Sequence, residues 1–316
     1  MDRMDIFPTK ILLATDGSED AALATRAAAD LSIRTGSELY VVHAWRFVAS
    51  YSAYPGEMLK NHTRLNERAA QELLTKQVNQ IESMGGTVTE AFLRQGPPID
   101  EVLSLGEELH PGLVVIGSRG LGPVGSLLAG SVSEGVVHHA HCPVLVVRGG
   151  QQTWPPQRIV IGDDSSDPAK KAGELGAVIA QLFDTDVVMV RAYENPPEPI
   201  GGWGAQDRLK LDEALLREER ALEERAKELQ AIAGSRPESR LIETEPTLAL
   251  LLIAEEKDEP NKDKDKGGGE VDCKQRLQGC LRENLVPFEV QHHPRAITAI
   301  SVLASRGLPT RATPRT

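Results

Sequence analysis

The chain carries the same pattern of apolar and polar residues twice, and this repeat limits its fold more than any other feature. Residues 11–45 align without a gap on residues 159–193, at a constant offset of 148 positions. The identical pairs include Ile11 with Ile159, Asp16 with Asp164, Ser18 with Ser166, Ala24 with Ala172, Val42 with Val190 and Ala44 with Ala192. A tandem duplication is the simplest explanation. The length of 316 residues also fits two domains of roughly 150 residues.

Short apolar runs alternate with amphipathic segments along the first half of the chain. The runs predicted as strands are 10–16, 37–45, 87–96, 112–118 and 142–148, and the predicted helices are 19–36, 57–83, 99–109 and 131–140. The run at 112–118 is continuously apolar, as in strands that are buried on both faces of a parallel sheet. This alternation predicts an α/β fold with a doubly wound parallel sheet.

The second half follows the same order but lacks the final third of the pattern. A charged helix is predicted at 207–233, and residues 248–256 resemble residues 99–108. Residues 259–270 are charged and glycine-rich where the first half has a buried strand. We therefore predict a first domain at 1–150, a truncated second domain at 151–256 and a tail at 257–316 that is either divergent or partly disordered. In that tail, 284–290 predicts a weak strand and 295–307 a helix.

Composition excludes several classes of protein. The net charge is -11 and both halves are acidic, which argues against nucleic-acid binding. No stretch reaches the roughly 18 apolar residues of a membrane helix. The three cysteines, Cys142, Cys273 and Cys280, are too few for a disulfide framework. We expect a soluble cytoplasmic protein that has no membrane or nucleic-acid partner.

A glycine-rich stretch follows the buried run at 112–118. Gly117, Gly120 and Gly130 have the spacing G-x2-G-x9-G, and Ser131 and Ser133 follow them. Backbone without Cβ atoms can approach phosphate oxygens closely, and the start of the next helix adds its positive dipole. The same residues also fit a simple turn followed by a capping box from Ser131 to Glu134.

An acidic residue ends the strand expected beside this stretch. Asp16 closes the first apolar run, where a carboxylate is well placed to accept hydrogen bonds from ribose hydroxyls. The alternative role for Asp16 is to cap the following helix, which Ser18 could do instead.

Residues 14–18 and the glycine motif together resemble the universal stress protein family, in its ATP-binding branch and tandem two-domain form. The resemblance covers residues 8–148 well, and 157 to about 256 through the repeat. It implies an adenine nucleotide alpha hydrolase-like, Rossmann-like fold with a five-stranded parallel sheet in the order 3-2-1-4-5. Asp16 and Gly117 would then meet at the topological switch point, where such sheets bind ligands.

The resemblance also implies the binding roles of individual residues. It places Ala14, Thr15 and Asp16 beside the nucleoside, the backbone of Val42 at the adenine, Gly117 and Gly120 at ribose and phosphate, and Gly130, Ser131, Val132 and Ser133 at the phosphates. Val42 could instead be an ordinary core residue. Arg119 could pair with a phosphate or remain solvated on its turn.

The predicted function is that of an ATP-binding stress-response or signalling module, with Mg2+ accompanying the nucleotide. The P-loop signature G-x4-G-K-[ST] is absent from the sequence, so we expect weak ATPase activity at most. No second glycine motif follows Asp164, which predicts one nucleotide site per chain. His138, His139 and His141 are unsuited to a shared metal, because adjacent residues cannot share a helical face.

The sequence also allows two other classes of function to be considered beside nucleotide binding. A ligand-free scaffold of the same fold would dimerise through residues 142–148 as an open sheet edge. An adenylyl-transferring enzyme would need a glycine-rich loop after the first strand, and residues 15–20 offer a single glycine. The expected partners are therefore an adenine nucleotide and either a second copy of the chain or a stress-signalling protein.

Overall fold

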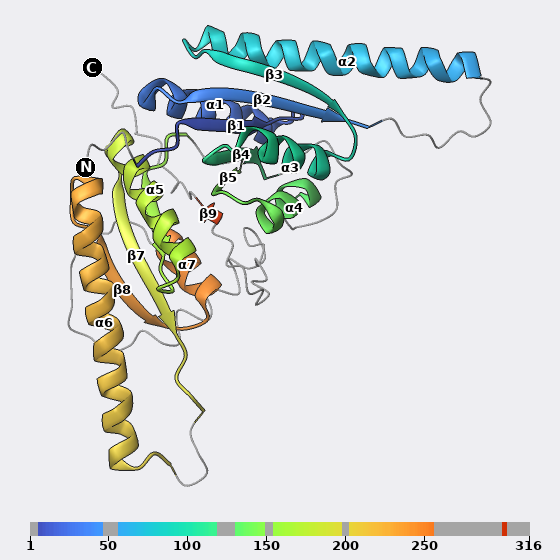
Figure 1. The fold of residues 1–316 in the computed structure, drawn as a ribbon. Helices are drawn as coiled ribbons and strands as arrows, with labels where there is room; N and C mark the ends of the chain where they lie inside the picture. Colours follow the sequence, from blue (N-terminus) through green and yellow to red (C-terminus); the bar gives the residue numbers. More distant parts are fainter. Residues whose placement is uncertain are drawn as a thin grey trace, which may run out of the picture.

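The computed structural model describes residues 6–46, 56–118, 130–148, 154–197, 202–255 and 299–301 (Figure 1). The first half comprises β1 (Lys10–Ala14), α1 (Glu19–Thr35), β2 (Glu38–Trp45), α2 (Gly56–Ser83), β3 (Val88–Gln95), α3 (Pro98–Leu109), β4 (Leu113–Gly117), α4 (Ser131–His139) and β5 (Val144–Val147). The second half comprises β6 (Arg158–Gly162), α5 (Asp167–Phe183), β7 (Asp186–Tyr193), α6 (Ala205–Ala233), β8 (Glu238–Glu243) and α7 (Pro246–Glu255), and β9 (Ala299–Ser301) follows.

The first sheet is parallel and runs in the order β3-β2-β1-β4-β5, followed by β9. Helices cover both of its faces. Alternate residues of β1 face opposite sides: Ile11 and Leu13 pack with α1 and α2, whereas Leu12 and Ala14 pack with α3 and α4. The predicted α/β fold and the strand order 3-2-1-4-5 are confirmed. The order reverses between β1 and β4, so their ends form the switch point.

The edge next to β5 differs from the sequence-based expectation. β9 pairs with β5 in parallel, with Leu145 opposite Ile300, and β9 also lies against α5. Residues 142–148 are therefore not the open edge that the alternative scaffold hypothesis requires. The helix predicted at 295–307 is wrong at residues 299–301, because pairing with an existing strand overrides local helical periodicity. The strand predicted at 284–290 lies outside the described residues.

The second half repeats the first through three strands and three helices. Its sheet is parallel in the order β6-β7-β8, with α5 and α6 on one face and α7 on the other. Ser166 caps α5 by accepting from Ala169 N at 3.2 Å, as Ser18 caps α1 by accepting from Ala21 N at 3.3 Å. The duplicated sequence therefore produces duplicated local structure.

The two halves meet at the C-terminal ends of α1 and α5. Arg34 Nη1 donates to Leu182 O at 3.0 Å, and its guanidinium lies 4.6 Å from the centre of the Phe183 ring. Trp154 Nε1 donates to Asp30 Oδ2 at 2.8 Å, and the indole packs edge-on against Phe183. Apolar residues of both halves consequently form one continuous buried cluster.

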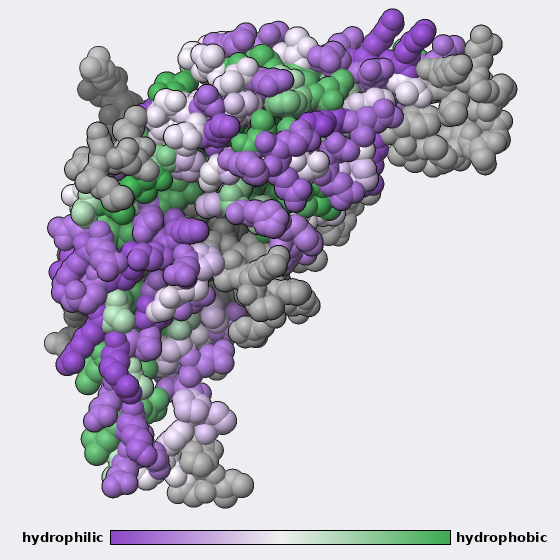
Figure 2. Space-filling view, viewed as in Figure 1, coloured by the Kyte–Doolittle hydropathy of each residue, from purple (hydrophilic) through white to green (hydrophobic). Residues whose placement is uncertain are grey.

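Hydrophilic side chains cover most of the two long helices, α2 and α6, on the face in Figure 2. Exposed leucines are scattered along them at Leu65, Leu209 and Leu216. Among the described residues, no helix is both long and apolar enough to cross a bilayer.

The turn after the first strand of each half gives a test of backbone strain. Gly17 has φ +77° and Ser165, its counterpart, has φ +66°, a conformation that costs a residue with a Cβ about 1–2 kcal/mol. We expect Ser165→Gly to raise the free energy of unfolding by roughly 0.5–1 kcal/mol, because relief of strain exceeds the entropic cost of glycine. Gly17→Ala should lower it, since a Cβ would also lie 2.9 Å from Leu73 Cδ1. Urea unfolding followed by circular dichroism measures both, and a destabilised Ser165→Gly variant would contradict the strain.

Candidate functional site

Strand pairing brings the C-terminal ends of β1, β2 and β4 together, and these ends form one edge of the first sheet, distinct from the lateral edge beside β5. Ala14 lies opposite Val42 on one side and Ile116 on the other. Thr15 N donates to Val42 O at 3.0 Å, which extends the β1–β2 ladder beyond the end of β1. The predicted residues 14–16, 42 and 117 therefore converge on this edge.

The turn from β1 to α1 is held by its own side chains. Asp16 Oδ1 accepts from Ser18 N at 3.0 Å, and Ser18 caps α1. Capping is therefore done by Ser18, and Asp16 is half-buried at the end of the strand. This arrangement holds the Asp16 carboxylate in the turn that follows β1.

Polar side chains buried beneath this turn were not predicted from the sequence. His43 Nδ1 donates to Thr15 O at 2.8 Å. Gln77 Oε1 accepts from Thr25 Oγ1 at 3.0 Å and from Thr15 Oγ1 at 3.4 Å. The side chain of Thr15 is thus directed to α1 and α2, so any contact of Thr15 with a ligand would come from its main chain.

Two of the predicted binding residues are part of the core. Ala14 and Val42 are buried, with 6% and 1% of their surface exposed, and pack in the cluster beneath α3 and α4. The carbonyl of Val42 is already bonded to Thr15 N. A core role for Val42 is therefore observed, and an adenine contact through its backbone stays a prediction.

Gly117 is required by packing at the end of β4. A Cβ on Gly117 would lie 2.7 Å from Ala21 N and 2.8 Å from the carbonyl carbon of Asp20. The first turn of α1 therefore presses directly on this strand. The sequence indicated close approach of a phosphate here, but the neighbour that the structure shows is a helix backbone.

Ser118 connects three elements at the same point. Ser118 Oγ donates to Asp20 Oδ2 at 2.6 Å, which links β4 to α1. Ser118 O accepts from Gly130 N at 2.6 Å and from Ser133 Oγ at 3.0 Å, which links β4 to α4. Asp20, Ser118 and Ser133 are all buried. No motif marked Asp20 or Ser118, because their roles depend on contacts between residues 98 positions apart.

Four of the predicted phosphate-binding residues, 130–133, form the N-terminus of α4. Gly130 is the N-cap, and no side chain of the described residues caps the helix there. The capping box from Ser131 to Glu134 is therefore wrong: Ser131 is already the first helical residue. Ser131 is exposed, Val132 half-buried and Ser133 buried, while Arg119 and Gly120 lie outside the described residues.

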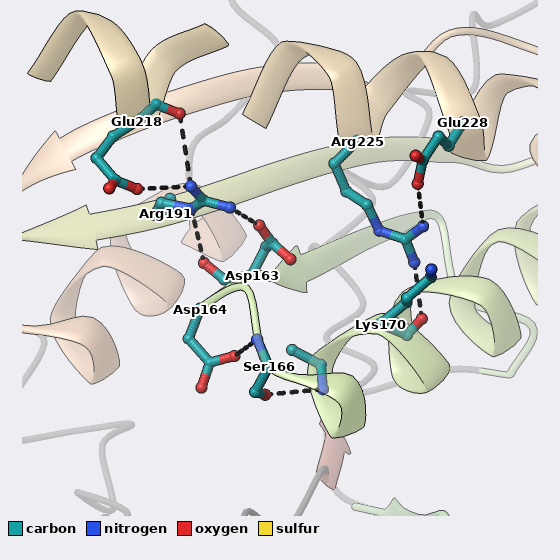
Figure 3. Close-up of polar contacts among 9 residues, drawn as sticks. Asp163, Asp164, Ser166, Lys170, Arg191, Glu218, Arg225 and Glu228 are labelled. Atoms are coloured by element: carbon teal, nitrogen blue, oxygen red, sulfur yellow. Dashed lines mark hydrogen bonds and ion pairs between the residues drawn. The ribbon is translucent and has the colours of Figure 1, made fainter. Parts of the chain in front are cut away.

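The same edge of the second half is occupied by charged groups (Figure 3). Arg191 replaces His43 and binds the carbonyl of Asp163 at 3.3 Å, as His43 binds that of Thr15. The guanidinium also pairs with the Asp163 carboxylate and, at 2.7 Å, with Glu218 Oε2. Burial alone would lower the pKa of Arg191, but bonding to the two carboxylates raises it.

The charged groups are substitutions at equivalent positions. At the offset of 148, Thr15, His43 and Ala70 of the first half become Asp163, Arg191 and Glu218 of the second. Gln77 likewise becomes Arg225, which donates to Lys170 O at 2.9 Å and to Glu228 at 2.7 Å. The second half thus keeps the turn, including the hydrogen bond from Ser166 N to Asp164 Oδ1. Ion pairs between charged side chains stabilise it in place of neutral hydrogen bonds.

Other reactive side chains do not extend the site. Burial raises the pKa of the Cys142 thiol to about 11, so it is protonated at neutral pH. His141 lies 3.8 Å from Glu107, and both are exposed. Within the described ranges, no three His, Cys, Asp or Glu side chains gather as metal ligands would.

Comparison with known proteins places both halves in one family. The profile described as "Universal stress protein family" matches residues 8–148 and 156–259. A universal stress protein of Thermus aquaticus is 39% identical over 142 residues, covering 44% of this chain and 97% of the relative.

Solved structures of the family are also similar to this chain, and the first named here supports the fold. A universal stress protein of Archaeoglobus fulgidus is 20% identical, covers 78% of this chain and 82% of its own, and has a TM-score of 0.55. A family member from Arabidopsis thaliana, solved with AMP bound, is 24% identical, covers 45% of this chain and 93% of its own, and has a TM-score of 0.33.

The ion network of the second half should be cooperative. Arg191→Met leaves the Asp163 carboxylate buried without its cation, so we expect a loss of about 3 kcal/mol or more in the free energy of unfolding. The triple variant Asp163→Thr, Arg191→His, Glu218→Ala installs the residues of the first half and should cost much less. Urea unfolding and hydrogen exchange of the β6 and β7 amides would measure the difference. Equal losses in the two variants would argue against the network.

Proposed function

The chain belongs to the universal stress protein family, and on that premise we propose that its first half binds one adenine nucleotide, ATP with Mg2+, at the exits of β1 and β4. The bound nucleotide regulates the conformation or partners of the protein in a stress response. The observation that carries this proposal is the start of α4. Its main-chain amides adjoin the switch point of the sheet, and no side chain among the described residues caps them.

Other helices of the first sheet support the choice of α4. α1 also begins at the switch point, but Ser18 caps it and its first turn carries Glu19 and Asp20. α3 has Pro97 as its N-cap and Pro98 as its first residue, neither of which has an N–H to donate. Within the described part of the first half, α4 is therefore best suited to receive a phosphate.

The hydrogen bonds within the site refine the role of each residue. The Ser133 hydroxyl donates to Gly130 O at 2.8 Å and to Ser118 O, so Ser133 would offer a phosphate its N–H. Ser131 is exposed and offers both its hydroxyl and its N–H. Asp16 would accept from the ribose hydroxyls. Gly120 and Arg119 retain their proposed phosphate roles on sequence grounds alone.

In this proposal Mg2+ accompanies the nucleotide phosphates. It keeps several waters and needs only one or two carboxylates besides phosphate oxygens. Its chemistry would be to neutralise the charge of the polyphosphate. Hydrolysis is slow at most in this proposal, because the sequence contains no P-loop lysine.

The alternative of a ligand-free scaffold that dimerises through β5 is less favoured. Its pairing edge is the one that β9 occupies within the same chain. The second half is proposed to bind no nucleotide, since no G-x2-G-x9-G follows Asp164.

The phosphate site can be tested with one glycine and a matched control. Gly130 has φ -59° and ψ 144°, which any residue adopts, so Gly130→Glu should fold. We expect it to weaken ATP binding by about 100-fold or more, because its carboxylate competes with phosphate at the same amides. Gly106→Glu adds the same charge in α3, where a Cβ meets open space, and should bind ATP normally. Titration calorimetry with ATP, ADP, AMP and cAMP measures affinity, and a wild-type chain that retains none of them in equilibrium dialysis would refute the proposal.

The ribose contact can be tested with the two equivalent turns. Asp16→Asn keeps an oxygen for Ser18 N but removes the charge, so we expect ATP affinity to fall about tenfold. Asp164→Asn makes the same change in the turn of the second half and should leave ATP affinity unchanged. Equal effects of the two variants in calorimetry would mean that Asp16 has no special part in binding.

A further inference from the structure

A buried carboxylate lies where the proposed site would least favour a negative charge. Asp20 is in the first turn of α1 and only 8% exposed, beside the exit of β4. Ser118 Oγ donates to Asp20 Oδ2 at 2.6 Å. A second anion near a phosphate-binding helix would repel the ligand, so its presence calls for a structural reason.

The contacts of Ser118 supply that reason. The same residue that binds Asp20 accepts, through its carbonyl, from Gly130 N and from the Ser133 hydroxyl. Its own N–H donates to Val147 O at 2.8 Å. Every polar group of Ser118 is thus engaged, and an unbroken line of hydrogen bonds joins α1 to the first turn of α4.

Backbone packing at Gly117, the residue before Ser118, also holds β4 against α1. Gly117 lies so close to Ala21 N that a Cβ would not fit. The exit of β4 is therefore held against α1 by backbone contact at Gly117 and by a hydrogen bond at Ser118. Both contacts set the position from which the amides of α4 would face a phosphate.

The second half shows that the repeat folds without this carboxylate. Its equivalent of Asp20 is Pro168, in the first turn of α5. α5 is nevertheless capped by Ser166 and has the same length as α1. The carboxylate accordingly occurs in the first half, which contains β4, α4 and the G-x2-G-x9-G motif. The second half lacks both the carboxylate and the motif.

We propose that Asp20 is a positioning residue for the phosphate end of the nucleotide site, acting through the Ser118 hydroxyl on the N-terminus of α4. The proposal rests on nucleotide binding by the first half. It assigns a role to a residue outside the glycine motif. Removal of the Asp20 carboxylate should then weaken ATP binding, whereas charge repulsion alone predicts that its removal would strengthen ATP binding.

The test compares ATP with adenosine, which lacks the phosphates, in the full-length chain. Asp20→Ala and Ser118→Ala should each weaken ATP binding about tenfold while changing adenosine binding by less than about twofold. Asp20→Asn keeps the acceptor for Ser118 and loses the charge, so it should bind ATP as well as the wild type or more tightly. Asp30→Ala removes a carboxylate from the other end of α1, where it bonds Trp154, and serves as the matched control.

The outcomes separate this inference from simpler accounts. If Asp20 acted only by its charge, Asp20→Ala would bind ATP more tightly, which would overturn the proposal. Equal losses for ATP and adenosine, or no rescue in Asp20→Asn, would also overturn it. Thermal unfolding of each variant confirms that binding is measured on folded protein, and the double variant Asp20→Ala, Ser118→Ala should lose no more than either single variant. A wild-type chain that binds adenosine but not ATP would refute the phosphate site itself.

Discussion

The close contact between the exit of β4 and the first turn of α1 determines the geometry around the proposed nucleotide site. Only a glycine fits at position 117, since the helix backbone lies within van der Waals contact of where a Cβ would be. All the polar groups of the next residue, Ser118, form hydrogen bonds, which join it to α1, β5 and α4. Because the strand order reverses here, the helices that follow β1 and β4 leave on opposite faces of the sheet, and these bonds connect the two faces.

The two halves show how one local structure can be stabilised by different chemistry. Each has an Asx turn after its first strand, a serine cap, and a side chain from the second strand bound to the carbonyl that ends the first. That side chain is a histidine in the first half and a buried arginine in the second. A guanidinium needs anionic partners when buried, and Asp163 and Glu218 provide them. The residues at positions 163, 191 and 218 therefore depend on one another.

Much of the fold could be predicted from the sequence because the signals are local and repeated. Apolar runs bounded by Asp-Gly-Ser and glycine gave the strands, and the offset of 148 gave the second copy. Asp20, Ser118 and His43 could not be identified, because each acts on a residue far away in the chain. β9 was missed for the same reason, since an edge strand is selected by its neighbour and not by its own periodicity.

The cap of α4 illustrates how function can conflict with stability in such a site. A serine cap would stabilise the helix by about 1 kcal/mol, as Ser18 and Ser166 do for α1 and α5. Ser131 and Ser133 lie within three residues of the cap, yet Gly130 is the N-cap. The Ser133 hydroxyl bonds to the carbonyl oxygens of Gly130 and Ser118 and does not cap the helix. In the proposed function these amides bind the nucleotide phosphates, and that binding would supply the missing stabilisation by mass action. Under the same proposal, nucleotide occupancy and the order of α4 would rise together, and the order of α4 would then report the bound state.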